Sequence, residues 1–174
     1  MPTFDLAAGG YAQPVVIVDG STGATSQSCT ASATFTPAAS SHVGGDCHGA
    51  AGTFALNAPS GCVFRITDVS LRIDGGTIET TAWTLHLYNV TPPSAIADDA
   101  AFDLPSGDRS AYLGSISIPQ VVDLGATLYV KSSNDSTLGT FKLAGTSLFG
   151  YLTNVTTLTP QAVAHVVTIT GVPV

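Results

Sequence analysis

The chain has 174 residues, of which 44% are hydrophobic and 10% are charged. A chain of this length forms one domain or one domain with an arm, and its apolar content is enough for a buried core, which excludes a fully disordered protein. Five Lys and Arg residues stand against 12 Asp and Glu residues, for a formal net charge of −7, and the five cations are scattered singly along the sequence. Because proteins that neutralise phosphates cluster their cations, we expect no nucleic-acid partner.

The sequence predicts neither a membrane segment nor a secretory route. The start, Met1–Asp5, lacks a basic region followed by an apolar stretch, and no apolar run approaches the roughly 18 residues that cross a bilayer. We therefore expect a soluble chain made in the cytoplasm, with no membrane partner. The low charge leaves a surface of small polar residues that is weakly protected against association, which favours a protein that functions within an assembly.

Three cysteines, Cys29, Cys47 and Cys62, make an odd count in a chain too long to need disulfide cross-links. Free thiols are therefore expected. A Cys29–Cys47 or a Cys47–Cys62 bridge, formed after release into an oxidising medium, stays open as an alternative.

Residues 1–29 differ in composition from the rest of the chain and are predicted to form an N-terminal arm or an edge strand. Gly, Ser, Thr and Ala dominate this segment, apart from one β-branched island. The island is predicted to add a strand to a sheet edge, either on a neighbouring subunit or within the same chain. Its residues form the candidate interface: Val15, Val16, Ile17 and Val18.

Residues 30–174 are predicted to form one β-sandwich domain. The 18 Gly and 10 Pro residues of the chain divide it into short stretches rich in Val, Ile, Thr, Tyr and Phe, separated by turn-forming clusters at the spacing typical of a sandwich. We predict an all-β fold, an antiparallel β-sandwich that is jelly-roll-like. The predicted strands are 14–18, 33–36, 52–56, 62–73, 82–90, 112–118, 127–131, 140–143, 147–155 and 162–172.

The clearest predicted strand surrounds the single tryptophan of the chain. Trp83, Leu85 and Leu87 alternate with polar residues, so they share one face and are predicted to point into the core. His86 and Tyr88 lie on the opposite face. That face is predicted to be a polar sheet surface.

Two other segments carry local signals beyond simple alternation. In 62–73 the apolar alternation changes phase at Thr67-Asp68, which predicts a β-bulge or a sharp bend, as found where a strand passes from one sheet of a sandwich to the other. The segment 96–104 is the one place predicted to make a helical turn, with Asp98 as its N-cap.

The densest group of potential metal ligands is His42, Cys47 and His48, with Cys29 and Cys62 in the flanking segments. Zinc accepts His and Cys side chains in a tetrahedral shell, so these residues are weighed as a zinc site. Structural zinc sites place paired ligands about two to four residues apart, a spacing that is missing here. We therefore expect no bound metal and interpret these residues as small, half-buried side chains in a glycine-rich loop.

The sequence also lacks a recognisable catalytic arrangement. It has no Gly-x-Ser-x-Gly motif for a hydroxyl nucleophile, and His86 and His165 lie within alternating strands. Glu79 is the sole glutamate, and the aspartates concentrate in a loop-like run without the alternating pattern of a calcium loop. We therefore expect no enzymatic activity and no cofactor. The aspartates of that run are Asp98, Asp99, Asp103 and Asp108.

Several sequence blocks follow one another in a fixed order. They are Leu85–Asn89 (LHLYN), Pro92-Pro93, Ile96–Leu104 (IADDAAFDL), Tyr112–Ile116 (YLGSI) and Thr146–Leu152 (TSLFGYL). In this order they resemble a family of tailed-bacteriophage virion structural proteins, the head decoration or cement proteins, whose members carry LxLFNxxPP, IADNAAFxL, YLGxI and xxLYGxLV blocks. The resemblance covers roughly residues 30–172 and does not include the arm; Cys47 and His48 stand where the family has simple apolar residues.

The resemblance implies a non-enzymatic β-sandwich that binds the major capsid protein on the outer capsid surface and stabilises the head as a homo-oligomer, a homotrimer in the leading interpretation. It implies no cofactor, and localisation in the virion after synthesis in the bacterial host cytoplasm. An alternative is a receptor- or carbohydrate-binding module of a phage tail or fibre, which predicts a groove with exposed aromatic side chains. A jelly-roll metalloenzyme is a third class; it needs a His-x-His pair with a nearby Glu, which the sequence does not show.

Overall fold

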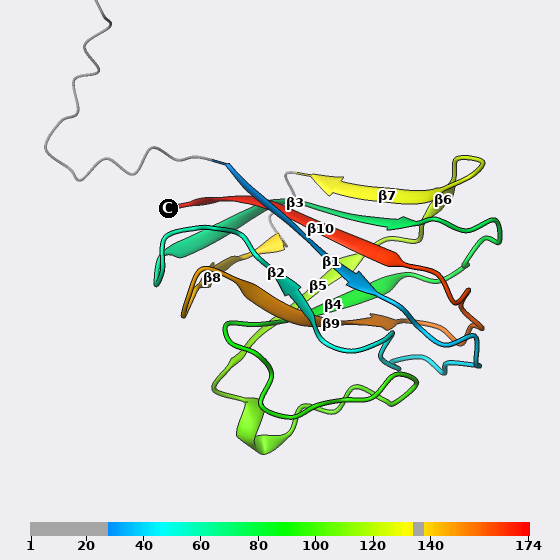
Figure 1. Cartoon of the computed structure of the whole chain (residues 1–174), viewed down its shortest axis with the longest axis horizontal. Helices are drawn as coiled ribbons and strands as arrows, with labels where there is room; N and C mark the ends of the chain where they lie inside the picture. Colours follow the sequence, from blue (N-terminus) through cyan, green and yellow to red (C-terminus); the bar gives the residue numbers. More distant parts are fainter. Residues whose placement is uncertain (1–27, 134–137) are drawn as a thin grey trace, which may run out of the picture.

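Two antiparallel sheets packed face to face make up the protein in its computed structural model, which describes residues 28–133 and 138–174 (Figure 1). The predicted all-β sandwich is confirmed. The predicted strand 14–18 and the candidate interface residues Val15, Val16, Ile17 and Val18 lie outside the described residues. No helix of the described part is long and apolar enough to cross a membrane.

The larger sheet has six strands and the smaller sheet has four. The larger sheet runs in the order β1 (Cys29–Phe35), β10 (His165–Pro173), β3 (Val63–Ile73), β7 (Leu128–Ser133) and β6 (Val122–Asp123), and β8 (Thr140–Lys142) also pairs with β3. The smaller sheet runs in the order β2 (Gly52–Phe54), β9 (Leu148–Asn154), β4 (Trp83–Tyr88) and β5 (Tyr112–Ile118). The predicted strands 33–36, 52–56, 62–73, 82–90, 112–118, 127–131, 140–143, 147–155 and 162–172 each overlap one of these, whereas β6 was not predicted.

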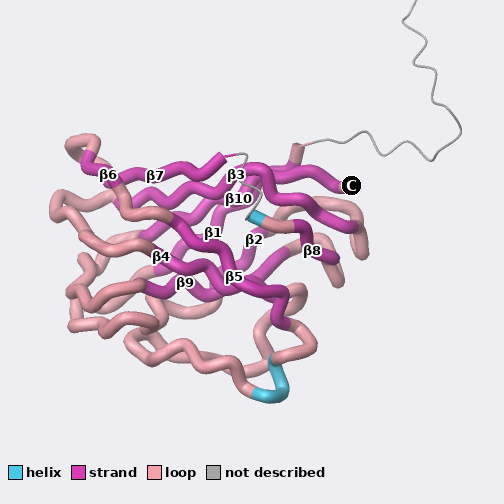
Figure 2. Tube along the Cα trace, turned by 180° about the vertical axis from the view of Figure 1, so that it is seen from behind, coloured by secondary structure: helices cyan, strands magenta, loops and turns pink. Residues whose placement is uncertain are grey.

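Between the described strands, the chain passes from one sheet to the other at six of nine connections; the pairs β4–β5, β6–β7 and β7–β8 each stay within one sheet. The resulting orders, β1-β10-β3-β7 facing β2-β9-β4-β5, are those of a jelly roll with the short strands β6 and β8 added. Figure 2 shows the same two layers from behind.

The space between the sheets is filled by the apolar sides of the alternating strands. Trp83, Leu85 and Leu87 are fully buried there, as predicted. Gly52 provides close contact between the sheets, because a Cβ atom at this position would lie 2.8 Å from both the Ala33 Cβ and the Phe35 ring. We call the buried residues between the two sheets the inner core; the alternation along the strands predicts them.

The predicted irregularity in β3 is a β-bulge. Thr170 of β10 pairs with Asp68 and Gly171 pairs with Ile66, which leaves Thr67 as the extra residue. The bulge does not move β3 to the other sheet, in contrast to the sequence interpretation. Instead it marks a change of edge partner, because β8 pairs with the residues before the bulge and β7 with those after it.

The connection from β4 to β5, residues 89–111, folds back over the outer face of the four-stranded sheet and lies at the bottom of Figure 1. The prediction of a polar, open surface on β4 is therefore wrong: Tyr88 is fully buried. The predicted helical turn at 96–104 is also wrong, and the helical element of this loop is a 3-10 turn, η1 (Ser106–Asp108). Asp98 does not cap a helix because its carboxylate accepts hydrogen bonds from another loop, and Asp99 has a left-handed backbone with φ of 61°.

Candidate functional site

Three connections, residues 36–51, 74–82 and 155–164, meet at one end of the sandwich together with residues 119–127, which contain β6; we call this end the loop end. The strand pairing places them together. Phe35 and Ile73, at the ends of β1 and β3, both pair with His165 at the start of β10. In the other sheet, Trp83 pairs with Asn154 at the end of β9.

Three histidines form a row inside the loop end. The ring centroids of His42 and His48 are 4.5 Å apart, and those of His48 and His165 are 5.6 Å apart. All three side chains are fully buried. The Trp83 ring meets His48 edge-on at 4.8 Å and closes the row against the inner core.

His165 is paired with the sole glutamate of the chain. Its Nε2 lies 2.8 Å from Oε2 of Glu79, which is also buried, and its Nδ1 lies 3.0 Å from the carbonyl oxygen of Val163. A carbonyl oxygen only accepts, so Nδ1 carries a proton. The other Glu79 oxygen accepts a hydrogen bond from the Gln161 amide at 2.9 Å.

His42 has a matching carboxylate at the other end of the row. Its Nδ1 lies 3.1 Å from the Ser40 carbonyl oxygen and its Nε2 lies 3.3 Å from Oδ1 of Asp98. Asp98 also accepts hydrogen bonds from the amides of Gly49 and Ala38, at 2.6 and 2.8 Å. Partial burial alone would raise the pKa of Asp98, but these hydrogen bonds, with His42, outweigh burial and lower it.

His48 occupies the centre, and neither of its ring nitrogens makes a hydrogen bond to a described residue. Burial lowers the pKa of His48 to about 4, and the neighbouring His165 and His42 act in the same direction. Near neutral pH the central ring is therefore uncharged. We call the whole arrangement the histidine chain: Asp98, His42, His48, His165 and Glu79.

Of the residues weighed as a zinc site, His42 and His48 lie together in the histidine chain, but none of the three cysteines joins them. Cys47 carries a free thiol that packs with Tyr88 and Tyr151 outside the four-stranded sheet, where burial raises its pKa to about 12. Cys29 and Cys62 pack against the inner core at strand starts, at the end of the sandwich opposite the loop end. Within residues 28–133 and 138–174, no group of three or more His, Cys, Asp or Glu residues could hold a metal ion.

The covering loop 89–111 encloses a second cluster, which we call the outer core. Its buried members are Cys47, Tyr88, Ala111 and Tyr151. Beside them the His86 ring stacks on Phe102, with centroids 3.6 Å apart. Both ring nitrogens are engaged, Nδ1 with the Tyr112 hydroxyl at 3.1 Å and Nε2 with the Thr153 hydroxyl at 3.3 Å. Burial lowers the pKa of His86 to about 4. His86 therefore has a packing role here.

The run of aspartates anchors the covering loop. Asp108 is buried and accepts hydrogen bonds from the amide and the hydroxyl of Ser94, at 3.2 and 2.8 Å. Asp99 accepts one from the Ser40 hydroxyl at 3.1 Å, next to the bonds of Asp98. Asp103 is exposed.

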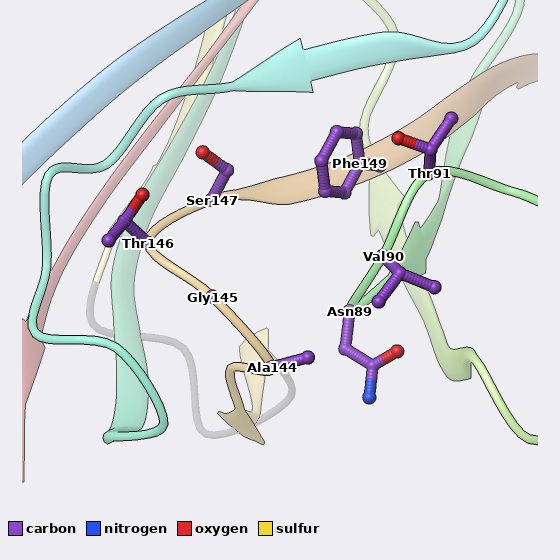
Figure 3. Close-up of a pocket in the computed structure, with 8 residues that line it drawn as sticks. All are labelled: Asn89, Val90, Thr91, Ala144, Gly145, Thr146, Ser147 and Phe149. Carbon is purple, nitrogen blue, oxygen red and sulfur yellow. The ribbon is translucent and has the colours of Figure 1, made fainter.

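An open hollow of about 380 Å³ lies at the end of the sandwich opposite the loop end (Figure 3). Asn89 and Thr91, at the start of the covering loop, face the β8–β9 turn across it, and the Phe149 ring lies beside them. Side chains of this type can hydrogen-bond and stack on a sugar. The residues that line the hollow are Asn89, Val90, Thr91, Ala144, Gly145, Thr146, Ser147 and Phe149.

Among residues 28–133 and 138–174, no loop covers the outer face of the six-stranded sheet, which we call the open face (Figures 1 and 2). Short hydroxyl side chains occupy it on β1 and β10: the hydroxyls of Thr30 and Thr170 are 3.0 Å apart, and those of Ser32 and Thr168 are 2.8 Å apart. These pairs lie on directly opposed residues of neighbouring strands. The open face is therefore a regular hydroxyl-bearing surface.

Sequence reasoning identified His42 and His48 but missed their partners in the histidine chain. His165 and Glu79 reach them only because β10 pairs with β3, a long-range contact that no local spacing shows. The only signal in the sequence was the small number of these residues, four His and a single Glu. The structure buries three of those histidines side by side.

A comparison with family models, with curated proteins and with solved structures finds no match.

Proposed function

We propose that this chain is a bacteriophage virion structural protein, a capsid decoration or cement protein that binds the major capsid protein on the outer surface of the head as a homotrimer and stabilises it. The observation that carries the proposal is where the blocks of the resemblance lie. Leu85–Asn89, Tyr112–Ile116 and Thr146–Leu152 belong to three adjacent strands of the smaller sheet or their immediate ends, and Ile96–Leu104 covers them. Blocks far apart in sequence therefore form one structural unit.

The open face supports a role in protein contacts. Ser and Thr side chains are short, so ordering them at an interface costs less conformational entropy than ordering long side chains. An extended β-sheet surface also contributes many weak contacts over a broad area, which is how a protein that bridges several capsid subunits gains affinity. A hydroxyl-bearing exterior of this kind counts against a carbohydrate-binding groove on this side of the molecule.

Reconstitution of heads tests the proposal. Heads assembled without this chain are mixed with the purified protein and sedimented, and the temperature at which the heads release DNA is measured. We expect saturable co-sedimentation, a higher release temperature, and a trimer in native mass spectrometry. The absence of this chain from intact particles, or no binding to heads that lack it, would end the proposal.

The same assay tests the candidate interface in the arm. Ile17→Asp is expected to weaken head binding if the island Val15–Val18 adds a strand to a neighbour. Val174→Asp is a matched control, because Val174 is exposed at 64% and lies at the other terminus of the chain. Equal binding by the two variants would show that the island contributes nothing to the interface.

The alternative, a receptor- or carbohydrate-binding module of a tail or fibre, has one observation in its favour. The hollow in Figure 3 combines amide and hydroxyl side chains with the aromatic ring of Phe149. This alternative predicts glycan binding that Thr146→Val weakens, together with no binding to heads. Head binding without glycan affinity would exclude it.

A further inference from the structure

The positive charges of the chain are concentrated on one side of the molecule. Four of the five Lys and Arg residues lie on strands of the six-stranded sheet: Arg65, Arg72, Lys131 and Lys142. All four are exposed and alternate with buried or partly buried residues that pack on the inner core, so their side chains project from the open face. Figures 1 and 2 both place these strands on the side opposite the covering loop.

Two of these cations are paired and two are not. Lys131 Nζ lies 3.2 Å from Asp68, and Arg72 Nε lies 3.3 Å from Asp74. Within the described residues, neither Arg65 nor Lys142 makes an ion pair. With Asp123 of β6, this side has four cations and three carboxylates among its described residues, a formal charge of +1 in a chain whose net charge is −7.

The opposite side of the molecule has the reverse balance. The covering loop 89–111 contains four aspartates, Asp98, Asp99, Asp103 and Asp108, and one cation, Arg109, for a formal charge of −3. The two sheets therefore present faces of opposite sign. Such a charge separation orients a protein as it approaches a charged partner.

We propose that the open face docks on a carboxylate-rich protein surface, with Arg65 and Lys142 as its contact cations and the acidic covering loop turned away. This inference rests on the proposed function and names the face that meets the capsid shell. Arg65 stands beside Thr140 of β8 and Val172 of β10, and Lys142 stands beside Val63. The residues paired with each free cation are therefore short and uncharged, so a partner protein can come close to the Arg65 and Lys142 side chains.

Two other occupants of the open face fit less well. A second copy of the chain would have to bring its acidic loop onto this face, but the two faces lie on opposite sides of the sandwich, so such a contact would build an open stack and not a closed trimer. A nucleic acid would meet four cations, two of which already have carboxylate partners. Duplex binding needs more neutralised phosphates than this face provides.

A charge-reversal pair provides the test. Arg65→Glu with Lys142→Glu removes the free cations of the open face, and Arg109→Glu makes the same type of change on the acidic side. We expect the double variant to lose about tenfold or more in affinity for heads at about 0.1 M salt, and Arg109→Glu to stay within about twofold of the wild-type protein. Urea unfolding of each variant confirms that the fold is intact. A double variant that binds heads like the wild-type chain would overturn the inference.

A second measurement does not depend on heads. At low salt and near neutral pH, the wild-type protein is expected to bind a carboxymethyl resin in spite of its negative net charge, and the double variant is expected to flow through. If the wild-type chain fails to bind heads but binds the resin through these cations, the proposed function fails and the assignment of the face stands. No retention on the resin overturns the assignment of the face. Duplex DNA binding or concentration-dependent stacking that the double variant abolishes would overturn the protein partner.

Discussion

The outer faces of the two sheets show how one pattern of alternating side chains leads to two different structures. On β4, the outward Tyr88 is fully buried because the covering loop 89–111 packs on it. On β7, the outward Tyr129 is partly exposed, since none of the described loops returns over the open face. The connection after a strand, and not the strand itself, decides whether an outward side chain contributes to folding or to the surface.

The largest expected difference between the two faces is in stability. Tyr88→Ala should lower the free energy of unfolding by about 3–5 kcal/mol, the usual cost of removing a large buried aromatic side chain. Tyr129→Ala should cost less than about 1 kcal/mol, because part of that ring is already in water. Urea unfolding followed by the fluorescence of the single, buried Trp83 measures both changes.

A conservative variant separates packing from hydrogen bonding at the same position. The Tyr88 hydroxyl is buried without a hydrogen-bond partner among the described residues. Tyr88→Phe should therefore keep or slightly raise the stability, because it removes an unsatisfied polar group without creating a cavity. A loss from Tyr88→Phe as large as that from Tyr88→Ala would show that the ring does not stabilise the outer core by packing.

The second expected difference is in the pH dependence of stability. His48 and His86 both have a pKa lowered to about 4 from the usual 6.5, in both cases mainly by burial, and the open face carries no histidine. The unfolded chain then binds more protons than the folded chain between these values. Stability is therefore fully present above about pH 6.5 and falls as the pH decreases toward 4, by on the order of 2–3 kcal/mol for each histidine.

Unfolding curves recorded from about pH 7 to about pH 4 check this expectation. His86→Gln can still hydrogen-bond to Tyr112 or Thr153 but cannot titrate, so it should remove about half of the pH dependence. Lys131→Gln on the open face should leave the slope in this window unchanged. A wild-type protein whose stability is flat across this window would contradict the neutral state assigned to His48 and His86.

The inner core could be predicted from the sequence because it depends on local alternation. The phase change at Thr67-Asp68 even located the bulge in β3. The covering loop could not be predicted, since its apolar residues Ile96, Phe102 and Leu104 have no regular spacing and pack on strands far away in sequence. A strand with an open outer face and one with a covered outer face have the same local pattern.

The histidine chain escaped prediction for a related reason. Its members come from separate loops and from the start of β10, and sheet pairing alone brings them together. His42, Cys47 and His48 form the densest group of potential metal ligands in the sequence, but Cys47 packs in the outer core whereas His42 and His48 belong to the histidine chain. Neighbours in a glycine-rich loop do not have to share a site.

The smallest expected effect concerns the attachment of the covering loop to the loop end. Asp98 joins the two because its carboxylate accepts hydrogen bonds from Ala38, Gly49 and His42. Asp98→Asn replaces one accepting oxygen by a donor that faces another donor, so it should cost about 1–2 kcal/mol of unfolding free energy. Asp103→Asn is the control, because Asp103 is an exposed residue of the same loop and should change the stability by less than about 0.5 kcal/mol. Hydrogen exchange should show that Asp98→Asn exposes the amides of Ala38 and Gly49. If Asp98→Asn and Asp103→Asn lower the stability equally, the charge of the covering loop, and not these hydrogen bonds, holds the loop in place.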